Sequence, residues 1–261
     1  MSRLLAPAKL TVSLAVTGVR PDGFHELRAE MVALNLADEL TFTEKGTGLT
    51  VAAGPGTRAE KLADEADNLI TRALAATGRS GSVHVHVVKR IPLGGGLGGG
   101  SSDAAAVLRW AGCSDPTVAI ALGSDVPFSL AGGRALVEGI GERVTPLDYE
   151  RREFLLLIPP FGVETSRVYA AWDAELVPTV GNNALAGAAL AVEPRLALWR
   201  DALGELTGEE PQLAGSGSTW FVQGGPLDAG SADMAWLHVG AERARLVRTC
   251  TVPSGWEGEG S

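Results

Sequence analysis

The stretch that decides the fold is Pro92-Leu93-Gly94-Gly95-Gly96-Leu97-Gly98-Gly99-Gly100-Ser101-Ser102-Asp103-Ala104-Ala105-Ala106. Its glycines carry no Cβ atom to obstruct a ligand, and positive φ angles are accessible at each of them. The serines and the aspartate are typical of a helix N-terminus, and the alanines after them favour a helix. A glycine loop that leads into a helix directs free N–H groups and the positive end of the helix dipole at one place. The stretch therefore predicts a phosphate-binding site.

Spacing separates the kinds of phosphate loop. A Walker loop is excluded, because aligning Gly95 and Gly100 puts Ser101 where the lysine must stand. The dinucleotide-binding pattern is met by the spacing of three of the glycines, but it requires a second parallel strand afterwards. Residues 115–122 instead favour a second helix. A glycine-rich turn that only packs closely is the remaining structural alternative.

The third kind of loop opens with proline and ends in two serines before an alanine-rich helix. It resembles the second motif of the GHMP kinase superfamily, Pro-x-x-x-Gly-Leu-Gly-Ser-Ser-Ala-Ala. The doubled glycines and the aspartate resemble more specifically the 4-diphosphocytidyl-2-C-methyl-D-erythritol kinase family. Further segments resemble that family's motifs in the same order: Ala6-Pro7-Ala8-Lys9-Leu10, Asp22-Gly23-Phe24-His25-Glu26-Leu27, Gly123-Ser124-Asp125-Val126-Pro127-Phe128 and Leu213-Ala214-Gly215-Ser216-Gly217. The resemblance extends from about residue 7 to residue 219.

The resemblance implies a two-domain α+β fold. Residues 1–147 would form an N-terminal domain like the second domain of ribosomal protein S5, and residues 153–250 a ferredoxin-like domain that completes the cleft. It also implies ATP-dependent phosphorylation of the C2 hydroxyl of 4-diphosphocytidyl-2-C-methyl-D-erythritol, a step of the non-mevalonate isoprenoid pathway.

The family's general base falls on Asp125, with Lys9 facing it to stabilise the developing alkoxide. From spacing alone, Asp125 would more often be a helix cap and Lys9 a half-buried strand lysine.

The resemblance assigns the ATP site to the glycine loop and its surroundings, namely Asn68, Leu69, Lys89, Pro92, Gly94, Gly95, Gly96, Leu97, Gly98, Gly99, Gly100, Ser101 and Ser102. The serine hydroxyls would reach phosphate or Mg²⁺. No carboxylate pair for the metal is evident, so we expect Mg²⁺ to be held mainly by phosphates and waters, and we assign no residue as a metal ligand. We expect Asp103 to be a first-turn acid, favoured by the helix dipole and without a catalytic part.

The cytidine end of the substrate requires an aromatic surface and a hydrogen-bonding partner. The candidates are Thr11, Phe24, His25, Tyr169, Gly215, Ser216 and Gly217. Two of them depart from the family, which usually has tyrosine at the position of Phe24 and asparagine at that of Thr11. Tyr169 is equally well explained as a core residue of a helix.

Composition limits the partners. A formal net charge of −9 without basic runs argues against nucleic acid and anionic membranes. Two cysteines form no disulfide framework, and neither a signal peptide nor a long apolar run is evident, so we expect a cytoplasmic protein. Monomer and homodimer both stay open. The rival functions are another GHMP kinase, acting on mevalonate or a sugar, and a non-catalytic nucleotide-binding relative.

Periodicity predicts the main elements outside the loop. Strands are expected at residues 10–16, 34–43, 83–87, 134–144 and 154–160, a helix at 68–76, a charged linker at 148–153 and a frayed end at 253–261. His84 and His86 share a strand face without an evident metal-ligating partner, which favours an exposed face over a metal site.

Overall fold

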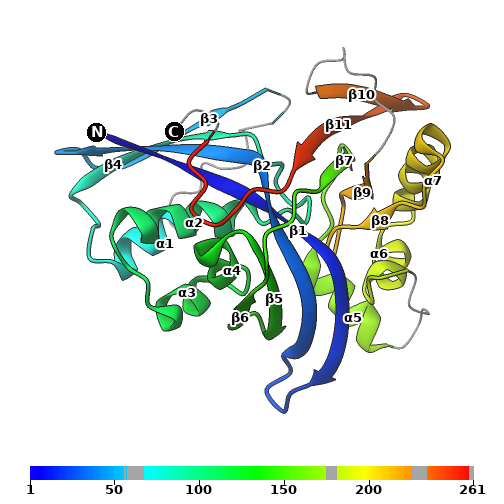
Figure 1. Cartoon of the computed structure of the whole chain (residues 1–261), viewed down its shortest axis with the longest axis horizontal. Helices are drawn as coiled ribbons and strands as arrows, with labels where there is room; N and C mark the ends of the chain where they lie inside the picture. Colours follow the sequence, from blue (N-terminus) through cyan, green and yellow to red (C-terminus); the bar gives the residue numbers. More distant parts are fainter. Residues whose placement is uncertain (56, 58–67, 175–180, 225–233, 259–261) are drawn as a thin grey trace.

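The computed structural model describes residues 1–55, 57, 68–174, 181–224 and 234–258 (Figure 1). Within these residues the strands form a six-stranded sheet from the first part of the chain and a five-stranded sheet from the second part. None of the helices in the described ranges is both long and apolar enough to cross a membrane. The α+β class expected from the sequence is confirmed.

The first sheet is covered on one face by four helices (Figure 1). Its strands run in the order β3-β4-β2-β5-β6, with β1 paired to β2, and β3 and β4 run parallel. The strands are β1 (Ser2–Val19), β2 (His25–Glu44), β3 (Gly48–Ala53), β4 (Val83–Lys89), β5 (Arg134–Gly139) and β6 (Arg143–Pro146), and the helices are α1 (Leu69–Ala76), α2 (Gly99–Trp110), α3 (Pro116–Leu122) and α4 (Val126–Ala131). Val83, Val85 and Val87 of β4 are buried against the helices, and His84 and His86 between them lie on the other face, as the alternation predicts.

The second sheet has the order β10-β11-β7-β9-β8 and packs against helices from the same half of the chain. Its strands are β7 (Glu153–Ile158), β8 (Gln212–Leu213), β9 (Trp220–Gln223), β10 (Met234–Val239) and β11 (Glu242–Cys250), and its helices are α5 (Thr165–Asp173), α6 (Ala186–Val192) and α7 (Arg195–Thr207). The two sheets share a core, because Leu14 and Met31 of the first lie in one apolar cluster with Leu155 of the second.

Most predicted elements are present, with corrections at their ends. Residues 134–144 form two strands rather than one, because the chain turns at Gly139 and Gly141, both with positive φ. The strand expected at 34–43 is the second half of β2, which continues from the hairpin with β1. The end expected to be frayed is in part attached, because Ser254 packs beside Gly133 and Gly258 packs beside Leu5. Residues 259–261 lie outside the described residues.

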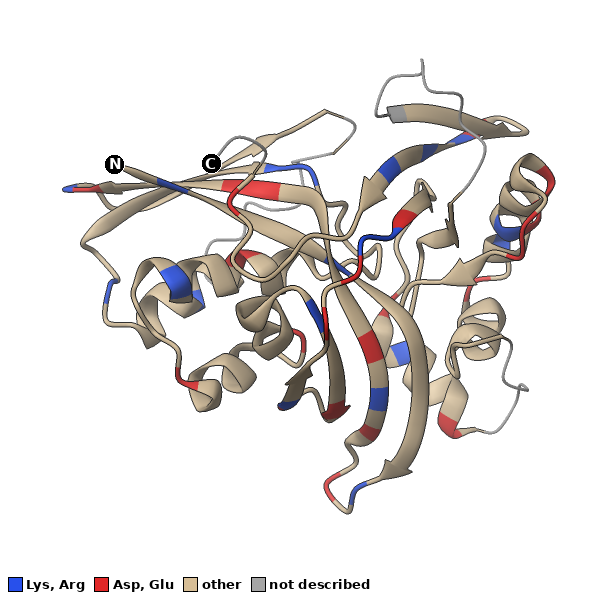
Figure 2. Ribbon diagram, in the orientation of Figure 1, with Lys and Arg blue, Asp and Glu red and all other residues tan. Residues whose placement is uncertain are grey.

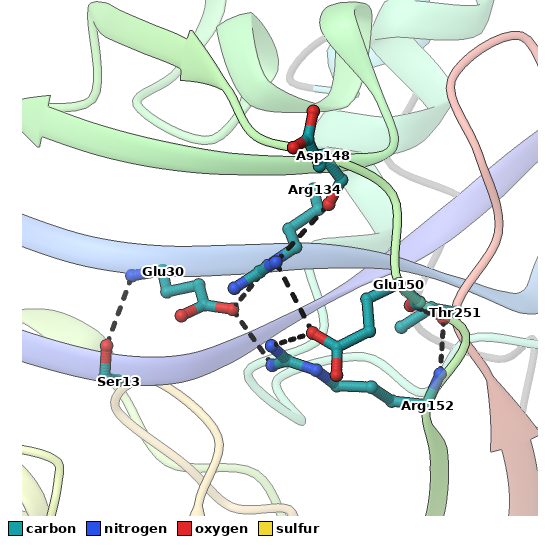
Figure 3. Close-up of polar contacts among 7 residues, drawn as sticks. All are labelled: Ser13, Glu30, Arg134, Asp148, Glu150, Arg152 and Thr251. Atoms are coloured by element: carbon teal, nitrogen blue, oxygen red, sulfur yellow. Dashed lines mark hydrogen bonds and ion pairs between the residues drawn. The ribbon is translucent and has the colours of Figure 1, made fainter.

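The charged segment between the two sheets is fixed to the first sheet (Figure 3). Oε1 of Glu30 on β2 accepts hydrogen bonds from Arg134 Nε at 2.8 Å and from Arg152 Nη1 at 2.9 Å. Arg152 also donates to Glu150 at 2.6 Å, and its backbone N–H donates to the hydroxyl of Thr251. The segment therefore connects the sheets through ion pairs rather than as a free linker. The domain limits 1–147 and 153–250 remain a prediction, and each sheet falls within one of them.

Candidate active site

The glycine loop leaves β4 and ends at α2, whose N-cap is Gly98 with φ +67°. Backbone N–H groups elsewhere in the protein donate to three of its carbonyls: Val163 to Gly94 at 3.3 Å, Thr219 to Gly95 at 3.2 Å and Lys9 to Leu97 at 3.0 Å. These carbonyls are therefore turned toward the protein. The first N–H groups of α2 have no acceptor within the helix, so they are the donors available to an anion.

Close contacts with neighbouring segments explain why the loop requires glycine. A Cβ atom built on Gly96 would lie 2.3 Å from the carbonyl oxygen of Ala214, and one on Gly98 would lie 2.7 Å from Cγ of Lys9. On the opposite side, the position of a Cβ atom on Gly215 is 3.3 Å from Lys9 Nζ. The glycine loop, the second glycine turn and the first strand thus meet around one lysine.

Lys9 and Asp125 form the ion pair at this meeting point. Lys9 Nζ lies 3.4 Å from Asp125 Oδ2 and donates to Thr11 Oγ1 at 3.1 Å. Asp125 stands at the N-cap position of α4, but within the described structure its side chain makes no capping hydrogen bond. The carboxylate therefore does not cap α4, which is the role that spacing alone favoured. At this separation the attraction is on the order of a few kcal/mol at the effective dielectric of a protein surface.

The predicted aromatic residues divide into a packed pair and an exposed ring. The His25 and Tyr169 rings lie 4.6 Å apart, and His25 Nε2 is 2.7 Å from Asp173 Oδ1. Burial and the negative charge of Asp125 raise the pKa of Tyr169 to about 12, so this phenol lies within electrostatic reach of the ion pair. Phe24, beside the turn that joins β1 and β2, is 55% exposed.

Lys89 lies beneath the loop, with its ammonium between two buried carboxylates. It forms ion pairs with Asp38 and Asp103, while Asp38 Oδ1 also accepts the N–H groups of Arg90 and Ile91. These contacts join the end of β4 to α2 across the base of the loop. The prediction that Lys89 contacts adenine would require its ammonium to bind the nucleotide in addition to both carboxylates.

The expectation that Asp103 is a first-turn acid of α2 was wrong. Asp103 lies in the second turn of α2, because the helix already begins at Gly99, and its carboxyl is buried against Lys89. Burial raises the pKa of this carboxyl to about 7. The adjacent Ser102 is also buried, and its hydroxyl donates to the Pro7 carbonyl at 2.5 Å. Of the two serines expected to reach phosphate or Mg²⁺, Ser101 is the more accessible.

The remaining predicted residues lie around the loop. Asn68 is the N-cap of α1 and accepts the Ile70 N–H at 2.8 Å. Leu69 approaches the loop, since its Cδ1 is 3.4 Å from the position of a Cβ atom on Gly100. Ser216 is buried and its hydroxyl lies 2.8 Å from that of Thr165 on α5.

Asn183 is a residue that the sequence analysis missed. Its side-chain amide donates to the carbonyls of Leu213 at 2.8 Å and Gly215 at 2.7 Å, and its Oδ1 accepts the N–H of Leu185. It thereby holds the second glycine turn in place against Lys9. No motif or periodicity marks it, because its partners are distant backbone atoms.

Comparison with known proteins agrees with this geometry. Residues 68–115, which hold the loop and α2, match the family model described as the GHMP kinases N-terminal domain. The 4-diphosphocytidyl-2-C-methyl-D-erythritol kinase of Polaromonas sp. is 40% identical over 186 residues, which cover 64% of this chain and 60% of that protein. The enzyme of the same name from Pseudomonas syringae pv. tomato is 33% identical over 240 residues, covering 84% of this chain and 83% of that protein. In several of these matches, therefore, the chain spans about 60% of the relative's length.

Solved structures give the same result for the fold. A crystal structure of 4-(cytidine 5'-diphospho)-2C-methyl-D-erythritol kinase superposes with a TM-score of 0.67 at 33% identity, covering 84% of this chain and 89% of that one. A mevalonate kinase of L. major superposes with a TM-score of 0.55 at 10% identity over 98% of this chain and 97% of that one, a likeness of fold alone. The extent of the Pseudomonas alignment and the shared fold establish that this chain belongs to the 4-diphosphocytidyl-2-C-methyl-D-erythritol kinase family of GHMP kinases.

Proposed function

We propose that this chain transfers the γ-phosphoryl group of ATP to the C2 hydroxyl of 4-diphosphocytidyl-2-C-methyl-D-erythritol. The observation that carries the proposal is that Lys9 contacts both the glycine loop and Asp125. Its side chain packs against Gly98, the N-cap of the helix that would receive phosphate, and its ammonium lies 3.4 Å from the Asp125 carboxylate. A hydroxyl bound at Asp125 would therefore face a phosphate bound at the loop.

The loop residues fit a polyphosphate. Gly99 and Gly100 open α2 without side chains that would cover their N–H groups, and Ser101 adds a hydroxyl in the same turn. ATP would supply the phosphoryl group, and the Mg²⁺ that it carries would neutralise charge on the phosphates. We propose that phosphates and waters hold most of the Mg²⁺ shell, with Ser101 as the hydroxyl nearest to it.

Asp125 would act as the general base. Its carboxylate would accept the proton of the substrate hydroxyl as that oxygen attacks the γ-phosphorus. The Lys9 ammonium, held by Thr11, would stabilise the negative charge that develops on the attacking oxygen. The partial exposure of the Asp125 side chain, 31%, leaves the carboxylate accessible to substrate while Lys9 stays buried.

The cytidine end would lie at the aromatic residues of the first hairpin and α5. Phe24 offers an exposed ring face for stacking on the base, and the His25–Tyr169 pair offers a polar edge beside it. Gly215, Ser216 and Gly217 would close the site from the second sheet. We further propose a cytoplasmic location and small-molecule partners, with the protein acting as a monomer or homodimer.

The test is ADP release from Mg·ATP in the presence of 4-diphosphocytidyl-2-C-methyl-D-erythritol, for the wild type and Asp125→Asn. The variant should lose roughly 10²–10⁴-fold in kcat, the usual contribution of a general base. Asp148→Asn, at an exposed aspartate in the segment between the sheets, is the matched control and should keep the wild-type rate. Turnover of mevalonate or a sugar instead would refute the substrate, and ATP binding without any turnover would indicate a non-catalytic relative.

A further inference from the structure

A cavity of about 1060 Å³ lies apart from the Lys9–Asp125 pair. It is bounded by the first residues of β1, the middle of β2, Arg90 just after β4, the C-terminal end of α2, part of β11 and residues 255–258. The glycine loop joins the opposite, N-terminal end of α2, about 18 Å away for a helix of this length. None of the described lining residues belongs to the candidate active site, so the cavity requires its own explanation.

The cavity concentrates positive charge in an acidic protein. Its described lining includes five arginines and one carboxylate, Glu257, although the chain as a whole carries a formal charge of −9. These arginines come from distant parts of the sequence, and β11 shows several Lys or Arg bands in Figure 2. They are Arg3, Arg90, Arg109, Arg245 and Arg248, and we call the space between them the arginine cavity.

Arg245 is the most buried of the five, with 4% of its surface exposed. Its guanidinium donates to the backbone carbonyls of Pro55 at 3.1 Å and Arg90 at 3.0 Å, and its Nε is buried without a hydrogen-bond partner among the described residues. Burial lowers the pKa of this arginine. The nearby Asp38 is already bonded to Lys89 and to the N–H groups of Arg90 and Ile91. A buried guanidinium that is bonded only to neutral groups is an expensive arrangement in the absence of an anion.

Two further arginines of the cavity also have no carboxylate bonded to them among the described residues. Arg109 donates to the carbonyls of Ser129 and Leu5, and burial lowers its pKa as well. The backbone of Arg248 pairs with Leu155 of β7, but its side chain makes no ion pair or hydrogen bond within the described part of the chain. By contrast, Arg3 and Arg90 share the carboxylate of Glu39. The arginine cavity thus contains three guanidiniums with no carboxylate bonded to them in the described structure.

We propose that the arginine cavity binds a small phosphorylated anion that carries an apolar or aromatic group. Guanidinium groups hold phosphate oxygens with paired, charge-assisted hydrogen bonds, and Arg109, Arg245 and Arg248 have no such bond to a carboxylate in the described structure. Leu5, Val247, Trp110 and Trp256 line the same space and provide apolar contact for the rest of such a molecule. The volume suits a ligand of ordinary metabolite size.

Isothermal titration calorimetry with inorganic pyrophosphate tests whether the arginine cavity binds phosphate groups. The titration is run on the protein without nucleotide, because a nucleotide such as AMP-PNP belongs to the proposed ligand class and would compete for the cavity. We expect the wild type to bind pyrophosphate, and binding at the cavity is the part that substitution of its arginines weakens. Arg248→Ala, and separately Arg3→Ala at the other end of the cavity, should weaken binding by about tenfold or more through loss of a charge-assisted hydrogen bond.

Arg143→Ala provides the matched control, because it removes the same charge from an exposed arginine of β6 outside the cavity. Its pyrophosphate affinity should stay within about twofold of the wild type, and urea unfolding should show all three variants folded. Phenyl phosphate should bind more tightly than inorganic phosphate if the apolar lining contributes. Absence of pyrophosphate binding, or an equal loss in Arg143→Ala and Arg248→Ala, would overturn the proposal, and neither result bears on the kinase activity.

Discussion

The ammonium of Lys9 lies 3.4 Å from the Oδ2 atom of Asp125, and this contact joins the first strand to the turn before α4. The two side chains differ in exposure, with 7% for Lys9 and 31% for Asp125. Lys9 is fixed on its other sides by Thr11 and by the backbone of Gly98. A fixed cation beside an accessible carboxylate stabilises the charge that develops on a bound hydroxyl, because the two side chains need not rearrange first.

Replacing Lys9 by methionine should therefore reduce rate more than affinity. We expect kcat to fall by roughly 10²–10³-fold, as when one preorganised electrostatic contact is removed, with KM values changed only slightly. Steady-state kinetics of ADP release measure both parameters. Lys45→Met, at an exposed lysine, is the control and should behave as the wild type. An unchanged kcat for Lys9→Met would refute the role given to this lysine.

Gly96→Ala should damage the loop, because the new methyl group would lie 2.3 Å from the carbonyl oxygen of Ala214 at a φ of +76°. Gly112→Ala separates the effect of backbone strain from that of the close contact, since Gly112 has a similar φ of +70° and nothing within 4 Å of a Cβ atom. The strain alone should cost about 1–2 kcal/mol of unfolding free energy in Gly112→Ala. We expect a larger loss in Gly96→Ala, with a KM for ATP raised by about tenfold or more from displacement of the loop. Urea unfolding and kinetics of both variants check this, and equal effects would contradict the close contact.

The Asp103 carboxyl should make stability depend on pH in a defined direction. Its pKa is about 7 in the folded protein and 3.8 for an ordinary aspartate, so the folded state retains the proton longer than the unfolded chain. The contribution of this group to stability is therefore greatest at low pH and decreases as pH rises from about 4 to about 7. Asp103→Asn removes the titration, so the stability of the wild type relative to the variant should fall between pH 5 and pH 8. Urea unfolding at the two pH values measures this, and a constant difference would contradict the raised pKa.

Local patterns were sufficient for much of the fold and the site. The alternation of β4, the Asn68 cap of α1 and the glycine loop before α2 each depend on neighbours in the sequence, and the structure contains all three. The predicted residues Lys9, Thr11, Asp125 and Gly215 are brought together, but family motifs rather than periodicity suggested that they would be.

Other features depend on tertiary contacts that no local pattern records. Asn183 binds the backbone carbonyls of Leu213 and Gly215. Because every residue has a backbone carbonyl, nothing in the sequence identifies these two as its partners. Asp103 resembled a helix-dipole acid because the start of α2 was placed too late, and its pairing with Lys89 depends on how β4 and α2 pack. The arginine cavity is formed by residues from both ends of the chain, so no local pattern predicts it. The net charge of −9 also gave no reason to expect a cluster of arginines.

The exposed ring of Phe24 provides a test of the cytidine assignment that stability effects do not confuse. Because the side chain is 55% exposed, Phe24→Ala should leave the free energy of unfolding within about 0.5 kcal/mol of the wild type. Stacking of a base on an aromatic ring contributes roughly 1–3 kcal/mol, so KM for the cytidine substrate should rise by about 5- to 100-fold while KM for ATP stays constant. Leu198→Ala, at a side chain of α7 that is 56% exposed, is the control and should change neither KM. A KM for the cytidine substrate that is the same in Phe24→Ala and wild type would show that the base is recognised elsewhere, with the His25–Tyr169 pair as the next residues to replace.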